Sequence, residues 1–157
     1  MVDDEDFEWL NQWKWRLETY ILKSRIIYYA IRSSPRVNGK WHKIWMHREI
    51  LGIKDSLQGD HKDDNGLNNQ RFNLRKATIA QNAQNRVKQK KCSSRFKGVY
   101  WNRQHQKWVS HIQSKNCYQY LGVFSNEIDA AMAYDTAARK TFGQFAKVNI
   151  PNNITTN

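Results

Sequence analysis

Four polar residues, Asp60, His61, Asn73 and Asn82, have the types and spacing needed to hydrolyse a phosphodiester bond. Such a reaction needs a base that activates water and a cation that stabilises the added charge on the phosphate. A neutral imidazole can take a proton from water near pH 7. A hard divalent cation prefers oxygen ligands, such as the carboxylate of an Asp and the carbonyl of an Asn. These residues therefore predict a hydrolytic centre with one metal ion and one histidine.

The elements that would position these groups are a strand, a long polar loop, a second strand and a helix. Residues 58–61 are predicted to form the first strand, in which successive side chains point to opposite faces. Asp60 can then hold the metal while His61 faces the water. Residues 72–77 alternate in polarity and are predicted to return as the second strand, with Asn73 opposite His61.

The helix is predicted from a capping box. Thr78 stands at the N-cap position and Gln81 at the third helical position, so that each side chain can bond the other's backbone. The helix would run from about residue 79 to 88. Packed on the two strands, it would bring Asn82 beside Asp60.

Five short motifs occur in order between residues 42 and 88 and resemble the HNH homing endonucleases of phages and mobile introns. The motifs are Met46-His47-Arg48-Glu49, Gly59-Asp60-His61, Asn65-Gly66-Leu67-Asn68-Asn69, Asn73-Leu74-Arg75 and Gln81-Asn82-Ala83-Gln84-Asn85. The fold of that family is a two-stranded hairpin and a helix around one metal ion.

The resemblance implies a role for each residue of the motif. Asp60 and Asn82 would be ligands of Mg²⁺ or Mn²⁺, His61 the general base, and Asn73 the residue that orients it. Cleavage should then weaken below about pH 6, where a protonated imidazole cannot accept a proton.

Three further residues of the motifs have less definite roles. Arg75 is expected to contact DNA. Asn85 contacts DNA or supports the helix, and His47 packs in a flanking helix or contacts phosphate. A zinc-held version of the site is disfavoured because the paired cysteine ligands are missing.

The charge of the chain indicates a polyanionic partner. The formal net charge is +12, and no acidic residue occurs between Asp64 and Glu127, a stretch that carries twelve Lys or Arg residues. Neutralising phosphates releases counterions, so such a block favours double-stranded DNA. A solvated basic face and a membrane-surface patch are the alternatives, but a membrane-surface patch usually takes the form of one amphipathic helix.

Residues 94–151 are predicted to form three strands followed by one helix. Strands are expected at 96–101, 107–113 and 118–124, with Ser125 capping the helix and Gly143 ending it. The segments Phe96-Lys97-Gly98-Val99, Lys107-Trp108, Tyr120-Leu121-Gly122-Val123-Phe124, Ala130-Ala131-Met132-Ala133-Tyr134-Asp135-Thr136-Ala137-Ala138 and Val148-Asn149-Ile150-Pro151 resemble the Apetala-two/ethylene-response-factor DNA-binding domain.

That resemblance implies a three-stranded sheet packed on one helix, with the sheet in the major groove of DNA. The residues that it places on or near the DNA face are Tyr100, Asn102, Arg103, Lys107, His111, Gln113, Tyr118 and Tyr120. Arg and Gln can pair with base edges, and Lys binds phosphate. Several positions that are Arg or Trp in the plant pattern differ here, so the target sequence is not inherited. Trp108, Tyr134 and Asp135 are expected to serve the core.

The fold class that these expectations give is α+β. A β-rich leader would span residues 1–41. An HNH core, made of two strands and a helix around a metal ion, would span residues 42–90. The small three-stranded sheet packed on one helix would span residues 94–151. Within the leader, a strand is expected at 26–32 and an Asn-Gly hairpin turn at 37–40. The leader resembles the N-terminal segments of the same nucleases. Those segments often have a strand before the point where this chain starts, so a shortened gene or a misjudged start codon is expected.

Other features exclude some classes of protein. No apolar run of about 18 residues is present, and the acidic N-terminal segment lacks the apolar part of a signal peptide. An intracellular protein without an obligatory protein partner is therefore expected. Cys92 and Cys117 fit a reducing compartment better than a disulfide.

Three functions remain open from the residues. The first is a metal-dependent endonuclease that cuts a specific duplex site, of the homing or mobile-element type. The second is a non-catalytic DNA-binding regulator with a relic nuclease domain. The third is RNA binding by the basic sheet. The complete set of Asp60, His61, Asn73 and Asn82 favours the first, because a decayed site should have lost at least one member.

Overall fold

The computed structural model describes residues 1–22, 25–84, 92–114 and 117–151 of the chain. Over these residues the fold is mixed α+β, with three small antiparallel sheets and four α-helices. The chain divides into two compact units, residues 1–82 and 83–157, which are described separately below. None of the helices within the described part of the chain is long and apolar enough to cross a membrane.

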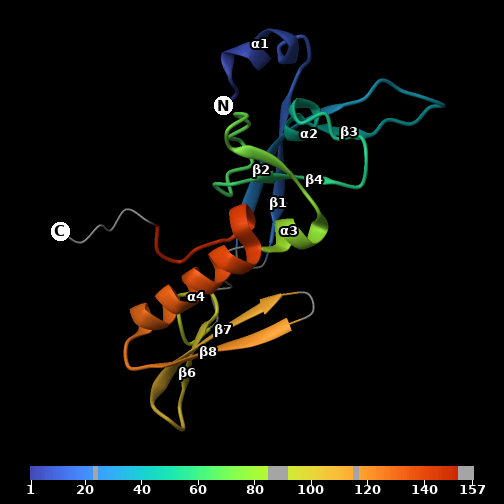
Figure 1. The fold of residues 1–157 in the computed structure, drawn as a ribbon. Coiled ribbons are helices and arrows are strands. Elements are labelled where there is room, and N and C mark those ends of the chain that lie inside the picture. Colours follow the sequence, from blue (N-terminus) through green and yellow to red (C-terminus); the bar gives the residue numbers. More distant parts are fainter. Residues whose placement is uncertain (23–24, 85–91, 115–116, 152–157) are drawn as a thin grey trace. The chain divides into compact units, whose positions relative to one another are not determined.

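The N-terminal unit contains a three-stranded sheet of β1 (Arg16–Ile21), β2 (Ile26–Ser33) and β3 (Lys43–Trp45), in that order (Figure 1). The predicted strand at 26–32 and the Asn-Gly turn are confirmed. Val37 and Lys40 form an isolated bridge, and Asn38 and Gly39 both have positive φ, of 50° and 73°. This is the backbone conformation that Asn-Gly favours in a two-residue hairpin turn. The sheet also includes β3, so it extends beyond residue 41, where the predicted leader ends.

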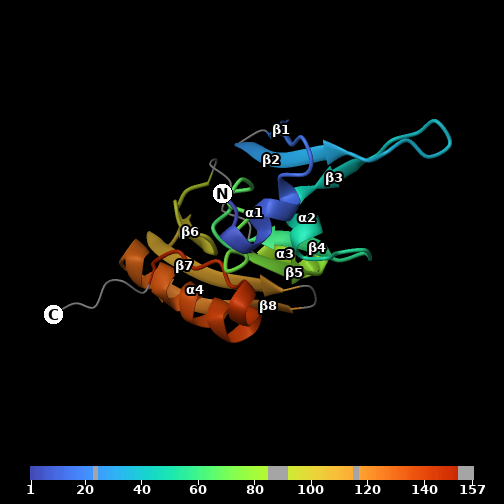
Figure 2. The same ribbon diagram turned by 90° about the horizontal axis from the view of Figure 1, so that it is seen from above.

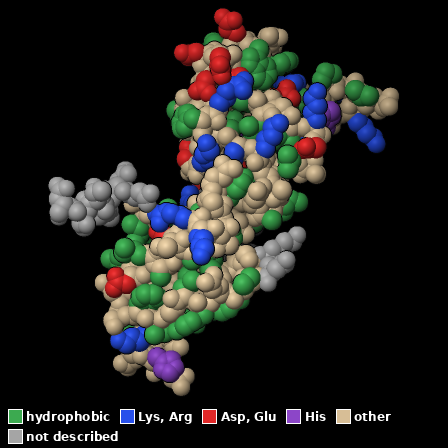
Figure 3. All heavy atoms as spheres, in the orientation of Figure 1, with side chains coloured by type: hydrophobic (Ala, Val, Ile, Leu, Met, Phe, Trp, Pro, Cys, Tyr) green, Lys and Arg blue, Asp and Glu red, His purple; other side chains and the backbone are tan. Residues whose placement is uncertain are grey.

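A short helix, α1 (Asp4–Leu10), precedes this sheet and was not among the predicted elements. Its first turn holds three acidic residues, where the helix dipole favours negative charge. Asp6 is fully buried, and both of its carboxylate oxygens accept hydrogen bonds from the guanidinium of Arg71, at 2.9 and 2.6 Å. Acidic side chains gather over α1 (Figure 3). The helix therefore depends on a partner 65 residues away in the sequence.

The second half of this unit has α2 (Met46–Ile50), β4 (Gln58–His61), β5 (Leu74–Ala77) and α3 (Ile79–Gln84). The capping box is confirmed, since Thr78 N donates to Gln81 Oε1 at 2.8 Å and Gln81 N donates to Thr78 Oγ1 at 3.2 Å. The part of the predicted helix beyond Gln84 lies outside the described residues. Leu10, Ile50 and Leu74 form a core that joins α1, α2 and β5.

The C-terminal unit is a sheet of β6 (Val99–Asn102), β7 (Lys107–Ser114) and β8 (Cys117–Phe124), followed by α4 (Glu127–Phe142) and a 3-10 turn (Gly143–Phe145). Helix α4 packs against the sheet (Figures 1 and 2). The expected cap was wrong by one residue, because Asn126 is the N-cap and accepts from Ile128 N at 2.8 Å. Gly143 ends the helix with a φ of 54°, as expected.

The core of this unit lies between the helix and one face of the sheet. Val99, Ala130 and Ala131 are buried with Trp108 packed against them, while Ile112, Tyr134 and Ala138 form a second buried group. The buried carboxylate of Asp135 accepts from Asn149 N and Ile150 N at 2.7 and 2.8 Å. Trp108, Tyr134 and Asp135 thus serve packing, as expected. Cys92 and Cys117 are exposed and free.

Candidate active site

Strands β4 and β5 pair antiparallel and set the positions of Asp60 and His61. Asp60 lies opposite Arg75, and His61 lies opposite Leu74. Asp60 is 4% exposed and His61 is 6% exposed, so both side chains are buried although they are adjacent in the strand. Because neighbours in a strand point to opposite faces, the carboxylate and the imidazole occupy two different environments.

Arg75 neutralises the buried carboxylate of Asp60. Its Nε and Nη2 atoms both lie 2.6 Å from Asp60 Oδ2. The two side chains are cross-strand partners and share one face of the hairpin. The sequence predicted Arg75 as a DNA contact, whereas the structure gives its guanidinium an ionic partner within the site. This pairing provides a cation for a charge that burial would otherwise disfavour.

His61 is fixed by an amide that the sequence did not single out. Its Nε2 atom lies 3.1 Å from Asn69 Oδ1 in a buried hydrogen bond. An amide oxygen only accepts, so Nε2 must donate, and the lone pair of the neutral ring is on Nδ1. Burial lowers the pKa of His61 below its ordinary value, more strongly than the Asn69 bond and the nearby acids raise it. The ring therefore stays neutral and basic somewhat below pH 6.5.

Asn73 does not occupy the position expected for it. Lys62 N donates to Asn73 O at 2.9 Å, and the strand partner of His61 is Leu74. The Asn73 amide donates to Asp63 Oδ1 at 2.9 Å and to Asn68 O at 2.8 Å, and its oxygen accepts from Asp63 N. Both amide hydrogens of Asn73 thus close the loop between the strands. Asn73 shapes the loop that carries Asn69, and Asn69 contacts His61.

Asn82 lies beside the face of β4 that bears Asp60. Its Nδ2 atom donates to Gln58 Oε1 at 2.6 Å. Gln58 and Asp60 are two residues apart in the strand and so point to the same face. This bond uses the amide nitrogen of Asn82, and its carbonyl oxygen is not part of it. Asn85, the other asparagine expected on this helix, lies outside the described residues.

His47 packs against the same hairpin from α2. Its ring centroid lies 4.9 Å from that of His61, and a Cβ atom on Gly59 would overlap its ring. Burial, then His61 and Arg48, lower the pKa of His47 to about 3. Within the described part of the chain its Nδ1 atom has no hydrogen-bond partner. Packing and phosphate contact were the two roles considered for His47, and this buried position agrees with packing.

Replacing His47 with Gln should reduce the sensitivity of the fold to acid. The pKa of His47 is about 3 in the folded protein and near 6.5 when unfolded. Between these values only the unfolded chain binds the proton, so stability is complete above pH 6.5 and is lost as pH falls toward 3. The loss from His47 alone should approach about 1.4 kcal/mol per pH unit.

The measurement is urea unfolding at several pH values between 7.5 and 4.5, for the wild type and His47→Gln. His42→Gln is the matched control, because His42 is exposed and lies outside the site. The control should keep the wild-type slope, whereas His47→Gln should have a shallower one. Equal slopes for all three proteins would contradict the buried, neutral state of His47.

Tyr29 is a second residue that sequence reasoning missed. Its ring contacts both histidines, with centroid distances of 5.5 Å to His47 and 5.9 Å to His61. Burial raises the pKa of its hydroxyl, and Asp60 is among the charges that add to this effect. Tyr29 comes from β2, about thirty residues before His61, and no local pattern linked the two. Alternation within β2 was the only sequence signal that it faces inward.

The C-terminal sheet presents aromatic and polar side chains on the face away from α4. Tyr100 and Tyr118 flank His111, at centroid distances of 5.6 and 5.2 Å. His111 lies opposite Tyr120, and Gln113 lies opposite Tyr118, so these side chains share the face. The residues that the structure brings together here are Tyr100, His111, Gln113, Tyr118 and Tyr120, which we call the outer aromatic face.

Three other residues expected near DNA surround the turn between β6 and β7. Asn102 Oδ1 accepts from Gln104 N and His105 N at 3.0 and 3.1 Å, so Asn102 stabilises the turn. Lys107 lies opposite Asn102 and donates to Ser125 Oγ at 2.7 Å. Arg103 is exposed in the turn. The structure therefore places these three at the end of the sheet, with Asn102 and Lys107 in local contacts.

Comparisons with known proteins give two kinds of relative. The uncharacterized HNH endonuclease L560 of Acanthamoeba polyphaga mimivirus is 30% identical over 139 residues, which cover 85% of this chain and 72% of the viral protein. The dehydration-responsive element-binding protein 2D of Arabidopsis thaliana is 41% identical over 64 residues, or 40% of this chain.

The dehydration-responsive element-binding protein 2C of the same plant is 43% identical over 47 residues, or 29% of this chain. The chain spans only 31% of the length of protein 2D and 14% of protein 2C. No protein-family model and no solved structure matches the chain.

Proposed function

The chain belongs to the HNH endonuclease family, and from this premise we propose that it is an endonuclease that hydrolyses phosphodiester bonds in double-stranded DNA. The observation that carries the proposal is the arrangement of Asp60 and His61 on β4. Their buried side chains point to opposite faces, and each is fixed by a defined partner, Arg75 for the carboxylate and Asn69 for the imidazole.

His61 acts as the general base in this proposal. With Nε2 bonded to Asn69, the Nδ1 lone pair takes a proton from a water molecule. The water oxygen attacks the phosphorus, and the bond from phosphorus to the leaving oxygen breaks. The lowered pKa of His61 keeps the ring neutral at physiological pH, as this step requires.

The residues on the Asp60 face fit a hard divalent cation. Asp60 is a buried carboxylate whose Oδ2 is paired with Arg75, and Asn82 is tied to the same face through Gln58. Asp60 and Asn82 would hold one Mg²⁺ or Mn²⁺ ion. That ion would supply stabilisation of the negative charge on the phosphate and the leaving oxygen. An acidic cluster of Asp3, Glu5 and Asp6 is engaged by Arg71 instead.

The C-terminal unit would bind the duplex and make cleavage specific to a site, as in a homing or mobile-element nuclease. The outer aromatic face can pack on sugars and thymine methyl groups, and Gln113 can bond base edges. Arg103 and Lys107 add positive charge at the end of the sheet. The plant relatives are named for binding a dehydration-responsive element, which supports a DNA partner for this surface.

Cleavage of a DNA library by the full chain tests the proposal. In Mg²⁺ or Mn²⁺ the wild type should produce ends that cluster at one sequence, and chelation should stop the reaction. Asp60→Asn should lose cleavage by at least about 100-fold, since it removes the charge that binds the cation. Asp129→Asn, the same change at an exposed position on α4, should retain it.

Two results would separate the competing functions. Tight and salt-dependent binding of duplex DNA without cleavage in either metal would support the non-catalytic regulator. Stronger binding of RNA than of duplex DNA across a salt titration would support the RNA-binding function.

A further inference from the structure

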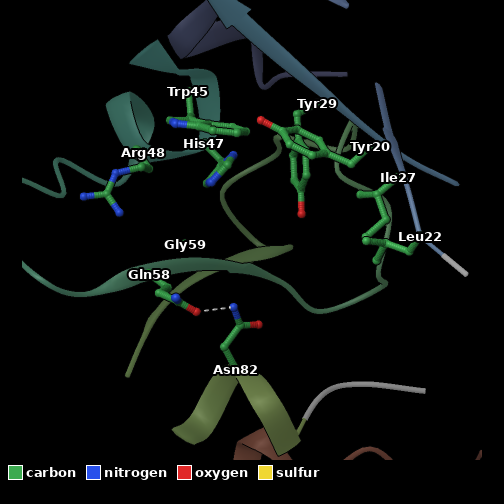
Figure 4. A pocket seen from close by; sticks show the side chains of 10 residues that line it. All are labelled: Tyr20, Leu22, Ile27, Tyr29, Trp45, His47, Arg48, Gln58, Gly59 and Asn82. Carbon is green, nitrogen blue, oxygen red and sulfur yellow. Dashed lines mark hydrogen bonds between the residues drawn. The ribbon is translucent and has the colours of Figure 1, made fainter. Parts of the chain in front are cut away.

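A pocket of about 380 Å³ lies in the N-terminal unit beside the proposed metal ligands. This volume is within the range of roughly 300–1,000 Å³ that is usual for small-molecule sites. Figure 4 shows its lining, in which an aromatic group from the β1–β2–β3 sheet faces the strand of Gln58 and Gly59 and the helix of Asn82. No residue of the proposed base or ligand set other than Asn82 lines it.

Three aromatic rings form one wall of this pocket. Tyr20 stacks on Trp45 with an interplanar angle of 24° and a centroid distance of 5.7 Å. Tyr29 stands nearly perpendicular to Trp45, at 5.4 Å. Aromatic faces of this kind bind nucleobases and sugars of any sequence, because every base offers a flat π surface.

Tyr29 contributes a hydroxyl to this wall, as Tyr20 does. The Tyr29 hydroxyl is directed toward the strand that carries Gln58 and Gly59 (Figure 4). Among the described residues none forms a hydrogen bond with it, although the ring is packed between His47 and His61. A phenol is protonated at neutral pH and so presents a donor.

The position of the pocket connects it to the chemistry. Gly59 precedes Asp60 in β4, Asn82 is a proposed ligand, and Tyr29 of the lining contacts the ring of His61, so the pocket borders the proposed site. On the other rim is Arg48, whose guanidinium is held in place by the carbonyl oxygens of Leu57 and Asp55, at 2.8 and 3.2 Å. Its positive charge favours a phosphorylated ligand.

We propose that this pocket binds the nucleoside next to the cleaved phosphate, and that the Tyr29 hydroxyl donates a hydrogen bond to an oxygen of that phosphate. The inference rests on the proposed nuclease function and adds to it a substrate subsite. No proton moves from Tyr29 in this role. The hydroxyl positions the phosphate beside His61 and stabilises the negative charge of the phosphate oxygen.

Tyr29→Phe tests this role because it removes one oxygen atom and keeps the ring. Tyr28→Phe is the matched control, since Tyr28 is the adjacent residue of β2, points to the opposite face and does not line the pocket. The rate of plasmid nicking at saturating protein in Mg²⁺ should fall at least tenfold for Tyr29→Phe, the size expected for a hydrogen bond to a charged group. Tyr28→Phe should nick like the wild type, and urea unfolding should show that both variants are folded.

A second measurement does not depend on cleavage. Thymidine 3′,5′-bisphosphate, added to the full chain without metal, should shift the NMR signals of the Trp45 indole and the Gly59 amide. Its affinity should be at least fivefold weaker in Tyr29→Phe and unchanged in Tyr28→Phe.

The outcomes distinguish failure of the subsite from failure of the nuclease proposal. A wild type that binds the bisphosphate at these signals but never cleaves DNA would overturn the nuclease and retain a nucleotide pocket. Equal nicking by Tyr29→Phe and the wild type, or bisphosphate shifts confined to other residues, would overturn the subsite while the nuclease stands.

Discussion

His61→Ala should reduce DNA cleavage by about 100- to 10,000-fold, the usual contribution of a general base. The change removes the imidazole that is bonded to Asn69 and leaves the opposite face of β4, with Asp60 and Arg75, unchanged. DNA binding should remain close to that of the wild type, because His61 is buried and the proposed DNA-binding face is in the other unit.

The measurement is a single-turnover cleavage assay at pH 7.5, combined with the fluorescence anisotropy of a labelled duplex without divalent metal. His42→Ala is the control, since His42 is exposed and its hydrogen-bond partner among the described residues is Ser34. The wild-type rate should persist below pH 6.5 and decline as pH falls through the lowered pKa of His61. Wild-type cleavage by His61→Ala would show that the base has been assigned to the wrong residue.

Gly98→Ala should destabilise the C-terminal unit by about 3–5 kcal/mol, the sum of overpacking and backbone strain. Gly98 has a φ of 76°, which disfavours any residue with a Cβ atom. An added Cβ would overlap the Tyr134 ring and lie 2.6 Å from the carbonyl oxygen of His111. Neither neighbour can move easily, because Tyr134 is buried under the sheet and His111 belongs to β7.

Hydrogen exchange of the α4 amides measures this effect in the full chain, together with the affinity for duplex DNA. Gly143→Ala is a closely matched control, since its φ is 54° but no atom lies within 4 Å of the added Cβ. It should report backbone strain alone, about 1–3 kcal/mol. Equal exchange rates in the two variants would contradict the close packing of Gly98 on Tyr134.

Much of the local structure was predictable because short patterns dictate it. The capping box at Thr78 and Gln81, the Asn-Gly turn and the strand at 58–61 each depend on residues within a few positions of one another. The third strand and helix of the C-terminal unit followed from alternation and from helical spacing. Three elements of the N-terminal unit had no predicted counterpart, namely β1, β3 and α1. The acidic first turn of α1 was a usable signal, but its buried Asp6 depends on the distant Arg71.

The opposed orientation of Asp60 and His61 was likewise predictable from the sequence. Adjacent residues in a strand must face opposite ways, so the separation of Asp60 from His61 required no tertiary information. The expectation that Asn73 contacts His61 failed by one position of register, since Leu74 is the strand partner. A shift of one residue reverses the face of a side chain. The loop that sets this register is closed by side-chain bonds of Asn73 to Asp63 and Asn68, which no sequence pattern indicated.

Only the tertiary structure decided which partners surround the pair. Asn69 bonds to His61 across the loop, Arg75 neutralises Asp60 across the hairpin, and Tyr29 reaches both histidines from another sheet. Each of these contacts joins residues whose separation in sequence carries no periodic signal. The sequence by itself therefore determined which polar groups lie together on β4 and which faces they take, because residue type and strand alternation are local properties. Their burial, charge balance and orientation depended on packing between distant segments, which local patterns do not encode.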